Sequence, residues 1–382
     1  MERHHHHMHY FKNTPITRMY ISNALRSFSL SLFGIFIPLI LINLEYSIQE
    51  VFYFYFIVVL GGILGHVFAV PLIRKFGIKH TMLMSIPFVI LFNLGMYTLV
   101  QYQWPIGILA AVHSLSIPLY WLPFHIEFSA HADSKKTGKQ VGILQSSTII
   151  ASILGPIIGG WIIFWLGPQA LIAASTVVII GSGFALLSSE DEKITIDFHP
   201  HDITTVLTRK QRIAFLADGV RQYIAALIWP MFIFLTGVGF LIVGSIMSIV
   251  RVVMAITSFI LGKIIDTPIG KKIFHVGTIV HSVTFAIRGF LSTIGGMTAI
   301  TSMGGFSFIL FHTPYTKIWY ERARVGGAKF VLLRELYFDV GRLFAISSAL
   351  ILYSITGSNF SLTAIILFFT CAVAIIAHSL IE

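Results

Sequence analysis

The chain has 382 residues, of which 56% are hydrophobic and only 11% are charged, and its formal net charge is +10. Strings of roughly 20 apolar residues recur from Ile21 to Ile381, which excludes a soluble globular protein. Backbone groups in hydrocarbon must be paired within one segment or within a closed barrel. Long apolar runs without period-two alternation therefore predict an all-α membrane protein. The single cysteine, Cys371, excludes a disulfide framework.

Apolar segments follow one another between glycines, prolines and charge clusters, and each is long enough to cross a bilayer as a helix. We place these twelve segments at residues 18–43, 49–72, 80–101, 104–128, 140–166, 168–188, 211–236, 238–265, 273–293, 296–318, 328–355 and 359–380. The longest polar connection, residues 188–210, divides them six and six. This division predicts an N-terminal half over residues 1–187, an inter-half linker, and a C-terminal half over residues 211–382.

Basic residues are distributed unevenly between the two sides of the predicted bundle. Of the 26 Lys and Arg residues, 20 lie in the N-terminal segment or in alternate connections, and the connections on the other side hold none. Because basic loops stay in the cytoplasm, we expect cytoplasmic termini and a multi-pass protein of the cell (cytoplasmic) membrane. Anchoring accounts for the positive charge, so nucleic acid is not expected as a partner.

Landmarks recur in the two halves at one spacing. Pro38 and Pro230 are separated by 192 residues, and so are Arg26 and Asp218. Internal repeats of this kind are the basis of many secondary transporters, in which the repeats pack around a shared site. The common offset predicts that the two halves are duplicates.

Short motifs between predicted helices resemble those of a known family. In the second half GKIIDTPIGKK contains Gly262, Asp266, Gly270 and Lys271, while the first-half copy VPLIRKFGIKH has Arg74 where the acid belongs. With these motifs the whole chain resembles the major facilitator superfamily. In that family the loop latches the cytoplasmic side of the outward-open state through its acid. The resemblance implies twelve helices in two pseudo-symmetric halves, with Asp266 as the latch.

The fifth segment provides a second match. Its sequence GILQSSTIIASILGPIIGG (142–160) resembles the antiporter motif in helix five of that family, with Gly142, Gly155, Pro156, Gly159 and Gly160 at matching positions. Small residues let two helices approach closely, and a proline loosens the backbone so that the segment can bend. An ordinary packing seam is the alternative. The helix-four arginine of the family's proton antiporters is missing, because residues 104–128 contain no Arg.

Charges within the predicted helices should face a wet cavity or each other. Arg26 and Asp218 both lie about nine residues into the first helix of their half, roughly 13 Å along it, which allows a contact across the central cavity. Arg221 is three residues beyond Asp218 and therefore lies on the same face. The alternative is a local pair of Asp218 and Arg221 without a role in ligand binding.

The stretch VLLRELYFDVGRLF, residues 331–344, places four charges in the eleventh segment. At about 100° per residue, Arg334, Glu335, Asp339 and Arg342 fall on one arc of the helix, and the opposite arc is apolar. Such a face suits a helix at the interface between the halves. Two interpretations stay open: either Glu335 and Asp339 exchange protons during transport, or the four charges neutralise one another and fix helix packing.

Single polar residues occur in other segments. Arg251, midway along the eighth segment, needs a partner on another helix or a bound anion. Arg288 lies nearer a helix end, and we expect it to extend towards the membrane surface. We expect His66, His113 and His281 to be hydrogen-bonded packing residues, although histidine titrates near neutrality. No spacing resembles a metal-ligand set, and no metal or cofactor is expected.

These features predict a secondary active transporter that works by alternating access. The helix-five motif indicates an antiporter, and the excess of six intramembrane arginines over three acids indicates an anionic or amphipathic solute. We therefore expect a proton-coupled antiporter of a small organic solute of this kind. Arg26, Arg221 and Arg251 are the expected substrate contacts, and Glu335 and Asp339 the expected proton-exchanging groups.

Two alternatives to the antiporter remain. One is a proton-independent exchanger of organic anions, and the other is a non-transporting membrane receptor or lipid-handling protein on the same fold. No nucleotide-binding or catalytic motif is recognisable in the sequence, so an enzyme is not expected. The expected partners are a small-molecule substrate, the lipid bilayer and protons, and the chain is expected to be a monomer.

Overall fold

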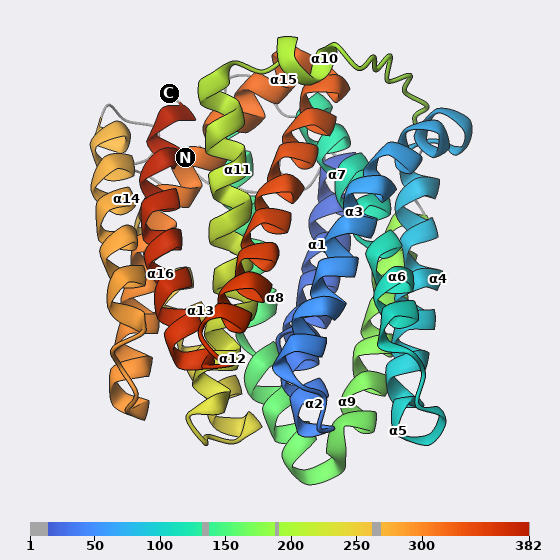
Figure 1. The fold of residues 1–382 in the computed structure, drawn as a ribbon. Coiled ribbons are helices and arrows are strands. Elements are labelled where there is room, and N and C mark those ends of the chain that lie inside the picture. Colours follow the sequence, from blue (N-terminus) through green and yellow to red (C-terminus); the bar gives the residue numbers. More distant parts are fainter. Residues whose placement is uncertain (1–13, 132–136, 188–190, 262–268, 382) are drawn as a thin grey trace, which may run out of the picture.

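The computed structural model describes residues 14–131, 137–187, 191–261 and 269–381, and the regular elements of these residues are all helices (Figure 1). Up to residue 187 the helices are α1 (Thr14–Phe33), η2 (Gly34–Phe36), α2 (Ile37–Asn43), α3 (Ile48–Phe76), α4 (Ile78–Tyr97), α5 (Leu99–Tyr102), α6 (Ile106–Ser116), α7 (Pro118–His131), α8 (Thr137–Ile153) and α9 (Gly155–Leu187). Beyond it they are α10 (Asp202–Thr205), α11 (Arg209–Tyr223), η3 (Ile224–Ile228), α12 (Trp229–Leu235), α13 (Phe240–Leu261), α14 (Ile269–Arg288), α15 (Ile294–Ile355), α16 (Phe360–Ala377) and η4 (His378–Ile381).

Among the described residues, eight helical stretches are long and apolar enough to cross a membrane. They are Thr17–Asn43, Ile48–Phe76, Ile78–Tyr97, Ile106–His131, Gln140–Leu187, Phe240–Leu261, Ile294–Ile355 and Phe360–Ile381. Two of the helices, α9 and α15, each join two helices across a glycine with positive φ, Gly167 at 82° and Gly327 at 65°. The all-α, multi-pass membrane fold is thus confirmed, whereas the count of twelve spans and the cytoplasmic termini stay predictions.

The helices form two groups that follow the sequence (Figure 1). Helices of residues 14–187, here called the first half, lie mainly on one side, and those of residues 209–381, the second half, on the other. We call the end of the bundle with α10 the upper end and the end with α2 and α5 the lower end. That the halves are separate, duplicated domains stays a prediction.

The first helix of each half is interrupted just before a proline. In the first half α1 gives way to the 3-10 segment η2, which begins four residues before Pro38. In the second half α11 gives way to the π-helical segment η3, which precedes Pro230. Proline lacks an N–H, and its ring displaces the carbonyl of the residue four positions earlier, so the regular hydrogen-bond pattern fails there. Short π-helical turns are common at functional sites.

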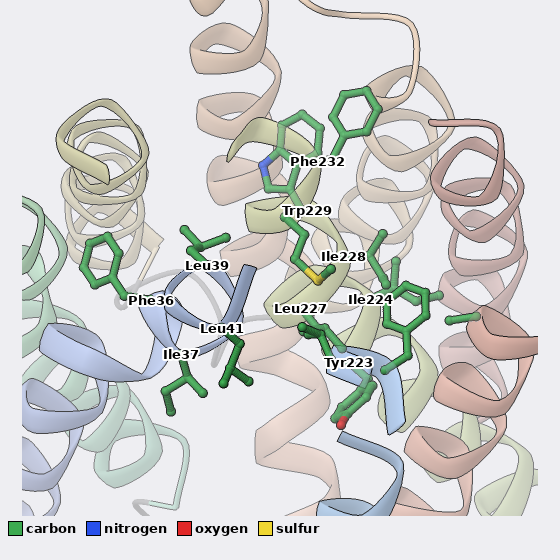
Figure 2. Packing of buried hydrophobic residues seen from close by; sticks show 14 of the residues in the cluster. Phe36, Ile37, Leu39, Leu41, Tyr223, Ile224, Leu227, Ile228, Trp229 and Phe232 are labelled. Atoms are coloured by element: carbon green, nitrogen blue, oxygen red, sulfur yellow. The ribbon is translucent and has the colours of Figure 1, made fainter. Parts of the chain in front are cut away.

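Two large clusters of buried apolar side chains hold the halves together. The larger one combines α2 residues and their neighbours, such as Phe36 and Leu39, with Trp229 and Phe232 of the second half (Figure 2). The Trp229 ring stacks on Phe232 with centroids 5.7 Å apart. The other cluster unites α7 with the upper parts of α11 and α15. Because lipid tails are as apolar as the side chains, this close packing is the main force that holds the helices together.

Two glycines fix α11 against the second part of α15. A Cβ on Gly219 would lie 1.9 Å from the Phe338 carbonyl oxygen, and a Cβ on Gly341 would lie 2.0 Å from that of Leu216. The two backbones therefore touch, and only glycine fits at either position. This contact brings Asp218 of α11 to the same depth as the charged stretch of α15.

Candidate functional site: a central cavity beneath an ionic layer

A cavity of about 360 Å³ lies inside the bundle between the two halves. Apolar side chains make most of its wall, and the polar residues include Arg26, Ser29, Asn93, Gln222, Asp339 and Arg342. The broken segments η2 and η3 also contribute to the wall. Small-molecule sites in proteins measure about 300–1,000 Å³, so the cavity is large enough for a small solute.

Arg26 lines this cavity from α1 and is only 2% exposed. Its Nη1 donates to Ser85 Oγ at 3.1 Å, and its Nη2 donates to the Ser116 carbonyl oxygen at 3.2 Å. The guanidinium carbon lies 4.0 Å from the centre of the Tyr120 ring, while Nε has no hydrogen-bond partner. Within the described part of the chain, Arg26 forms no ion pair with a carboxylate. A buried cation without an acid is costly, and a bound anion would neutralise it.

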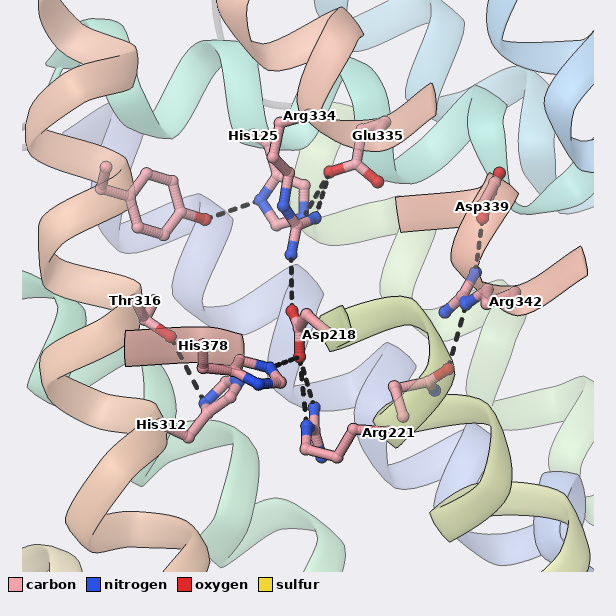
Figure 3. Close-up of polar contacts among 12 residues, drawn as sticks. His125, Asp218, Arg221, His312, Thr316, Arg334, Glu335, Asp339, Arg342 and His378 are labelled. Atoms are coloured by element: carbon pink, nitrogen blue, oxygen red, sulfur yellow. Dashed lines mark hydrogen bonds and ion pairs between the residues drawn. The ribbon is translucent and has the colours of Figure 1, made fainter. Parts of the chain in front are cut away.

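Asp218 is the centre of an ionic cluster that belongs to the second half (Figure 3). Its Oδ1 accepts from Arg221 Nη2 at 2.8 Å, and its Oδ2 accepts from Arg334 Nη2 at 3.3 Å. His378 Nε2 lies 3.4 Å from Oδ1. The contact between Arg26 and Asp218 that their equal depth allowed is not formed in this conformation, because each side chain finds its partners within its own half.

The four charges of α15 form local pairs with one another. Arg334 donates to Glu335 Oε1, and Arg342 Nη1 donates to Asp339 Oδ1 at 3.0 Å. Arg342 Nε also donates to Gln222 Oε1 of α11 at 3.0 Å (Figure 3). Asp339 and Arg342 line the cavity, whereas Arg334 and Glu335 lie one turn nearer the upper end.

Two histidines of the first half approach the acids of α15. His66 Nδ1 on α3 lies 3.1 Å from Asp339 Oδ2, and its Nε2 lies 3.9 Å from Glu335 Oε2. His125 Nε2 on α7 lies 3.6 Å from Glu335 Oε1, and its Nδ1 is 2.6 Å from the Tyr320 hydroxyl. Each acid thus has an arginine of its own helix on one side and a histidine of the other half on another.

The sequence contained little to reveal these histidines. His66 was expected to be a hydrogen-bonded packing residue, and its Nδ1 does lie 3.0 Å from the Gly62 carbonyl oxygen, while no expectation concerned His125. Among the other histidines, His113 stacks on Phe92 with centroids 4.3 Å apart, and His281 Nδ1 lies 2.9 Å from Ser307 Oγ.

The remaining intramembrane arginines lie outside the cavity wall. Arg221 is held by Asp218 and lies over the Phe308 ring at 5.1 Å. Arg251 forms no ion pair within the described residues. It lies two helical turns before Ser258 on the same face of α13, and the Ser258 hydroxyl is 3.1 Å from that of Ser146 on α8. Arg288 was expected to extend to the membrane surface, but this is wrong: it is 5% exposed, with its guanidinium 3.9 Å from the centre of the Phe285 ring.

The glycines of the helix-five motif form a seam on α9. Cβ atoms on Gly155 and Gly159 would lie 2.0 Å from Ser31 Oγ and 2.3 Å from the Leu32 carbonyl oxygen of α1, respectively. A Cβ on Gly160 would lie 2.8 Å from the carbonyl oxygen of Phe240 in the second half.

The same seam continues onto α13 of the second half. A Cβ on Gly244 would lie 2.2 Å from the Pro156 carbonyl oxygen, and the helix is interrupted between α8 and α9 at Leu154, two residues before Pro156. Gly142 has open space around it. The seam thus joins α9 both to α1 and to the other half.

The loop motifs at the upper end differ in how much the structure describes. Gly262 and Asp266 lie outside the described residues, so the expected latch stays a prediction, while Gly270 is buried and Lys271 exposed at the start of α14. In the first half, where Arg74 stands in place of the motif's acid, the Asp191 carboxylate lies at the start of the next helix. It accepts from the Lys79 N–H at 2.8 Å and from the His80 N–H at 3.2 Å, at the N-terminus of α4.

The connection after Asp191 also contacts the second half. Asp202 lies 3.0 Å from Lys329 Nζ, and the Tyr337 hydroxyl donates to the Ile203 carbonyl oxygen at 2.9 Å. The backbone N–H of His199 and the Lys329 ammonium lower the pKa of the Asp202 carboxyl. Residues 191–207, here called the strap, therefore bind both halves at the upper end.

A helical membrane bundle with a polar cavity between two groups of helices, bordered by buried charges, has the architecture of a secondary transporter. The model of the Major Facilitator Superfamily matches residues 19–332, and the chain belongs to this family. It is therefore a membrane transporter of that superfamily.

Two solved structures have the same fold at low sequence identity. A crystal structure of a variant of the E. coli fucose:proton symporter FucP has a TM-score of 0.67 and 11% identity, and the match covers 96% of this chain and 97% of that one. A structure of FucP in the outward conformation has a TM-score of 0.68 and 11% identity, with the same coverage. No curated protein sequence matches the chain. At this identity the likeness concerns the fold alone.

Proposed function

We propose that the chain transports a small organic anion together with a proton, with Arg26 as the anion-binding group and Asp339 as the proton-binding group. Membership of the superfamily supports the transport of a small molecule across the membrane. The anionic substrate and the proton coupling are the parts that the proposal adds.

The single observation that carries the proposal is the state of Arg26 in the cavity wall. It is buried, its Nε lacks a partner, and it forms no ion pair within the described residues. Of the two arginines that line the cavity, Arg342 is already paired with Asp339. An anion that enters the cavity therefore meets one uncompensated guanidinium, which favours a carboxylate, sulfonate or phosphate group over a cation.

Asp339 links the binding of a proton to the binding of the anion. While Asp339 is ionised, it occupies Arg342 Nη1 at 3.0 Å. When Asp339 takes up a proton, Arg342 loses its ionic partner and its guanidinium becomes free for the anion. Proton and anion then strengthen each other's binding by the same factor, and the favoured direction of coupling is symport.

Antiport, the direction expected from the sequence, is the second candidate. It is favoured by the seam of Gly155, Gly159 and Gly160, which resembles the family's antiporter motif. Antiport requires that a bound proton weaken substrate binding, and a proton repels a positively charged substrate. No acid neutralises Arg26 within the described residues, so the cavity disfavours a cationic substrate. One of the solved structures with the same fold is named a fucose:proton symporter.

The experiment uses purified protein in liposomes with a pH-sensitive dye trapped in the lumen and the membrane potential clamped. Four solutes are added outside: gluconate and benzenesulfonate as anions, glucose as a neutral solute and glucosamine as a cation. Anion–proton symport acidifies the lumen, whereas antiport makes it alkaline. Uptake of labelled gluconate without a pH change would identify the proton-independent exchanger.

Variants assign the effect to the residues. Arg26→Gln should abolish the anion-dependent pH change, while Arg288→Gln serves as the matched control, because Arg288 is equally buried but lies outside the cavity. Glucose transport without any anion effect would show the anionic assignment to be wrong. Anion transport that survives Arg26→Gln would show that Arg26 is not the binding group.

A further inference from the structure

Titratable side chains form a continuous row from the cavity towards the upper end. Asp339 lines the cavity, and His66 Nδ1 lies 3.1 Å from its Oδ2. His66 Nε2 lies 3.9 Å from Glu335 Oε2, and Glu335 Oε1 lies 3.6 Å from His125 Nε2. The row ends at the Tyr320 hydroxyl, 2.6 Å from His125 Nδ1. Acid and imidazole alternate along it.

We propose that His66 and His125 carry the coupled proton between Asp339 at the cavity and the upper end of the bundle. This inference rests on the proposed function, because it names the path by which the proton of that transport reaches and leaves its binding site. Neither histidine was among the residues that the sequence predicted to take part in proton exchange.

Each step transfers one proton and leaves no net charge behind. Nδ1 of His66 also lies 3.0 Å from the Gly62 carbonyl oxygen, which can only accept, so Nδ1 carries the N–H and Nε2 is the basic nitrogen. Glu335 in its acid form gives its proton to Nε2, and the resulting imidazolium releases the proton on Nδ1 to the Asp339 carboxylate. His125 likewise takes up a proton on Nδ1, on the side of Tyr320, and releases the proton on Nε2 to Glu335. The starting tautomers return by exchange with water when the halves separate.

The hydrogen bonding of the row fits a transfer path better than a static network. His66 Nε2 and Asp339 Oδ2 are both buried without a hydrogen-bond partner, although each faces a titratable group. A fully paired structural network would satisfy these atoms. The distances of 3.6 and 3.9 Å beside Glu335 exceed a direct hydrogen bond, so a proton transfer there requires a small approach of the side chains.

The surrounding charges keep both histidines available as carriers. Each acid already has an arginine: Arg342 faces Asp339 and His66, and Arg334 faces Glu335 and His125. Arg334 is further held by Asp218 on α11. With neutral imidazoles the two acids and two arginines of the row cancel, so a proton on either histidine adds one charge to the row.

The row also alternates between the two halves. His66 and His125 belong to α3 and α7, whereas Glu335, Asp339 and Tyr320 belong to α15. The path is therefore complete only while the halves touch at this level. Separation of the halves at the upper end would interrupt it, which prevents protons from leaking through the open conformation.

The first test uses full-length protein in lipid without any solute, so that it does not depend on the substrate assignment. A rapid pH jump is followed by infrared absorption of the Glu335 carboxyl, identified as the band that disappears in Glu335→Gln. We expect the double variant H66Q/H125Q to slow the response of this band at least tenfold. The control His281→Gln, a buried histidine bonded to Ser307, should leave the rate unchanged. An unchanged rate in the double variant would overturn the proposal.

The second test uses the liposomes with gluconate and benzenesulfonate. We expect the ratio of proton-driven accumulation to solute counterflow to fall at least tenfold in His66→Gln and in His125→Gln, because counterflow needs no net proton transfer. A purely structural role would reduce both measurements alike and leave the ratio intact, which would refute the path. If no anion is transported by the parent protein, the proposed function fails while the infrared result still decides the role of the histidines.

Discussion

Substitution of Arg26 gives the most direct measure of the anion site. Arg26 donates to Ser85 Oγ and to the Ser116 carbonyl oxygen and keeps Nε free. A charge-assisted hydrogen bond contributes about 1.5–3 kcal/mol, so Arg26→Gln should weaken anion binding about 10- to 150-fold. Arg26→Lys keeps the charge but loses the planar fork, and its effect should lie between the parent and Arg26→Gln.

Thermal unfolding in the presence of benzenesulfonate measures this loss without transport. At a concentration 100 times the parent Kd, the bound anion stabilises the parent by about 2.7 kcal/mol. A variant that binds about 100-fold more weakly gains only about 0.4 kcal/mol under the same conditions. Arg288→Gln should keep the parent's ligand-induced shift. Equal stabilisation of Arg26→Gln and the parent, or an equal loss in Arg288→Gln, would refute the assignment of the anion to Arg26.

Two further predictions concern the fold around the site. Gly341→Ala should lower the free energy of unfolding by about 1–3 kcal/mol, because its Cβ would meet the Leu216 carbonyl oxygen. The control Gly181→Ala, with open space around it, should be neutral or slightly stabilising. Similar melting temperatures for the two variants would contradict this prediction. Asp202→Asn should lower the melting temperature at neutral pH through loss of the Lys329 contact. Because the pKa of Asp202 is lowered in the folded protein, its stabilisation is present above the ordinary pKa of about 3.9 and disappears as pH falls through the lower folded value. The melting temperatures of parent and variant should therefore converge as pH falls through the lowered pKa of the folded protein. A difference that persists below that pKa would contradict the ionic contact.

The membrane fold could be predicted because its cause is local. Each apolar run is a property of adjacent residues, and hydrocarbon forces each run into a helix. The ionic arc of Arg334, Glu335, Asp339 and Arg342 was predictable for the same reason, since helical spacing alone places these side chains. Glycine breaks such as Gly167 and Gly327 likewise follow short-range chemistry.

The partners of these charges could not be predicted, because tertiary packing sets them. His66 meets Asp339 across 273 residues of sequence, and no periodicity encodes such a contact. Asp191 binds the backbone at the start of α4, although it comes from the strap, far along the chain. Arg288 looked close enough to a helix end to extend outwards, but aromatic neighbours bury it.

The charge balance of the bundle explains why the unpaired positive charge of the cavity lies on the side of the first half. Three acids of the second half, Asp218, Glu335 and Asp339, are paired with three arginines of the same half, Arg221, Arg334 and Arg342. Of the six intramembrane arginines, all of them among the described residues, Arg26, Arg251 and Arg288 remain without an acidic partner. Of these three only Arg26 lines the cavity.

The proposed anion-binding group, Arg26, lies on α1 and the proposed proton-binding group, Asp339, on α15, in opposite halves. Under this proposal a bound anion attracts Arg342 away from Asp339 only while both halves enclose it. Relative motion of the halves would then change the affinity for anion and proton together, which is the condition for coupled transport.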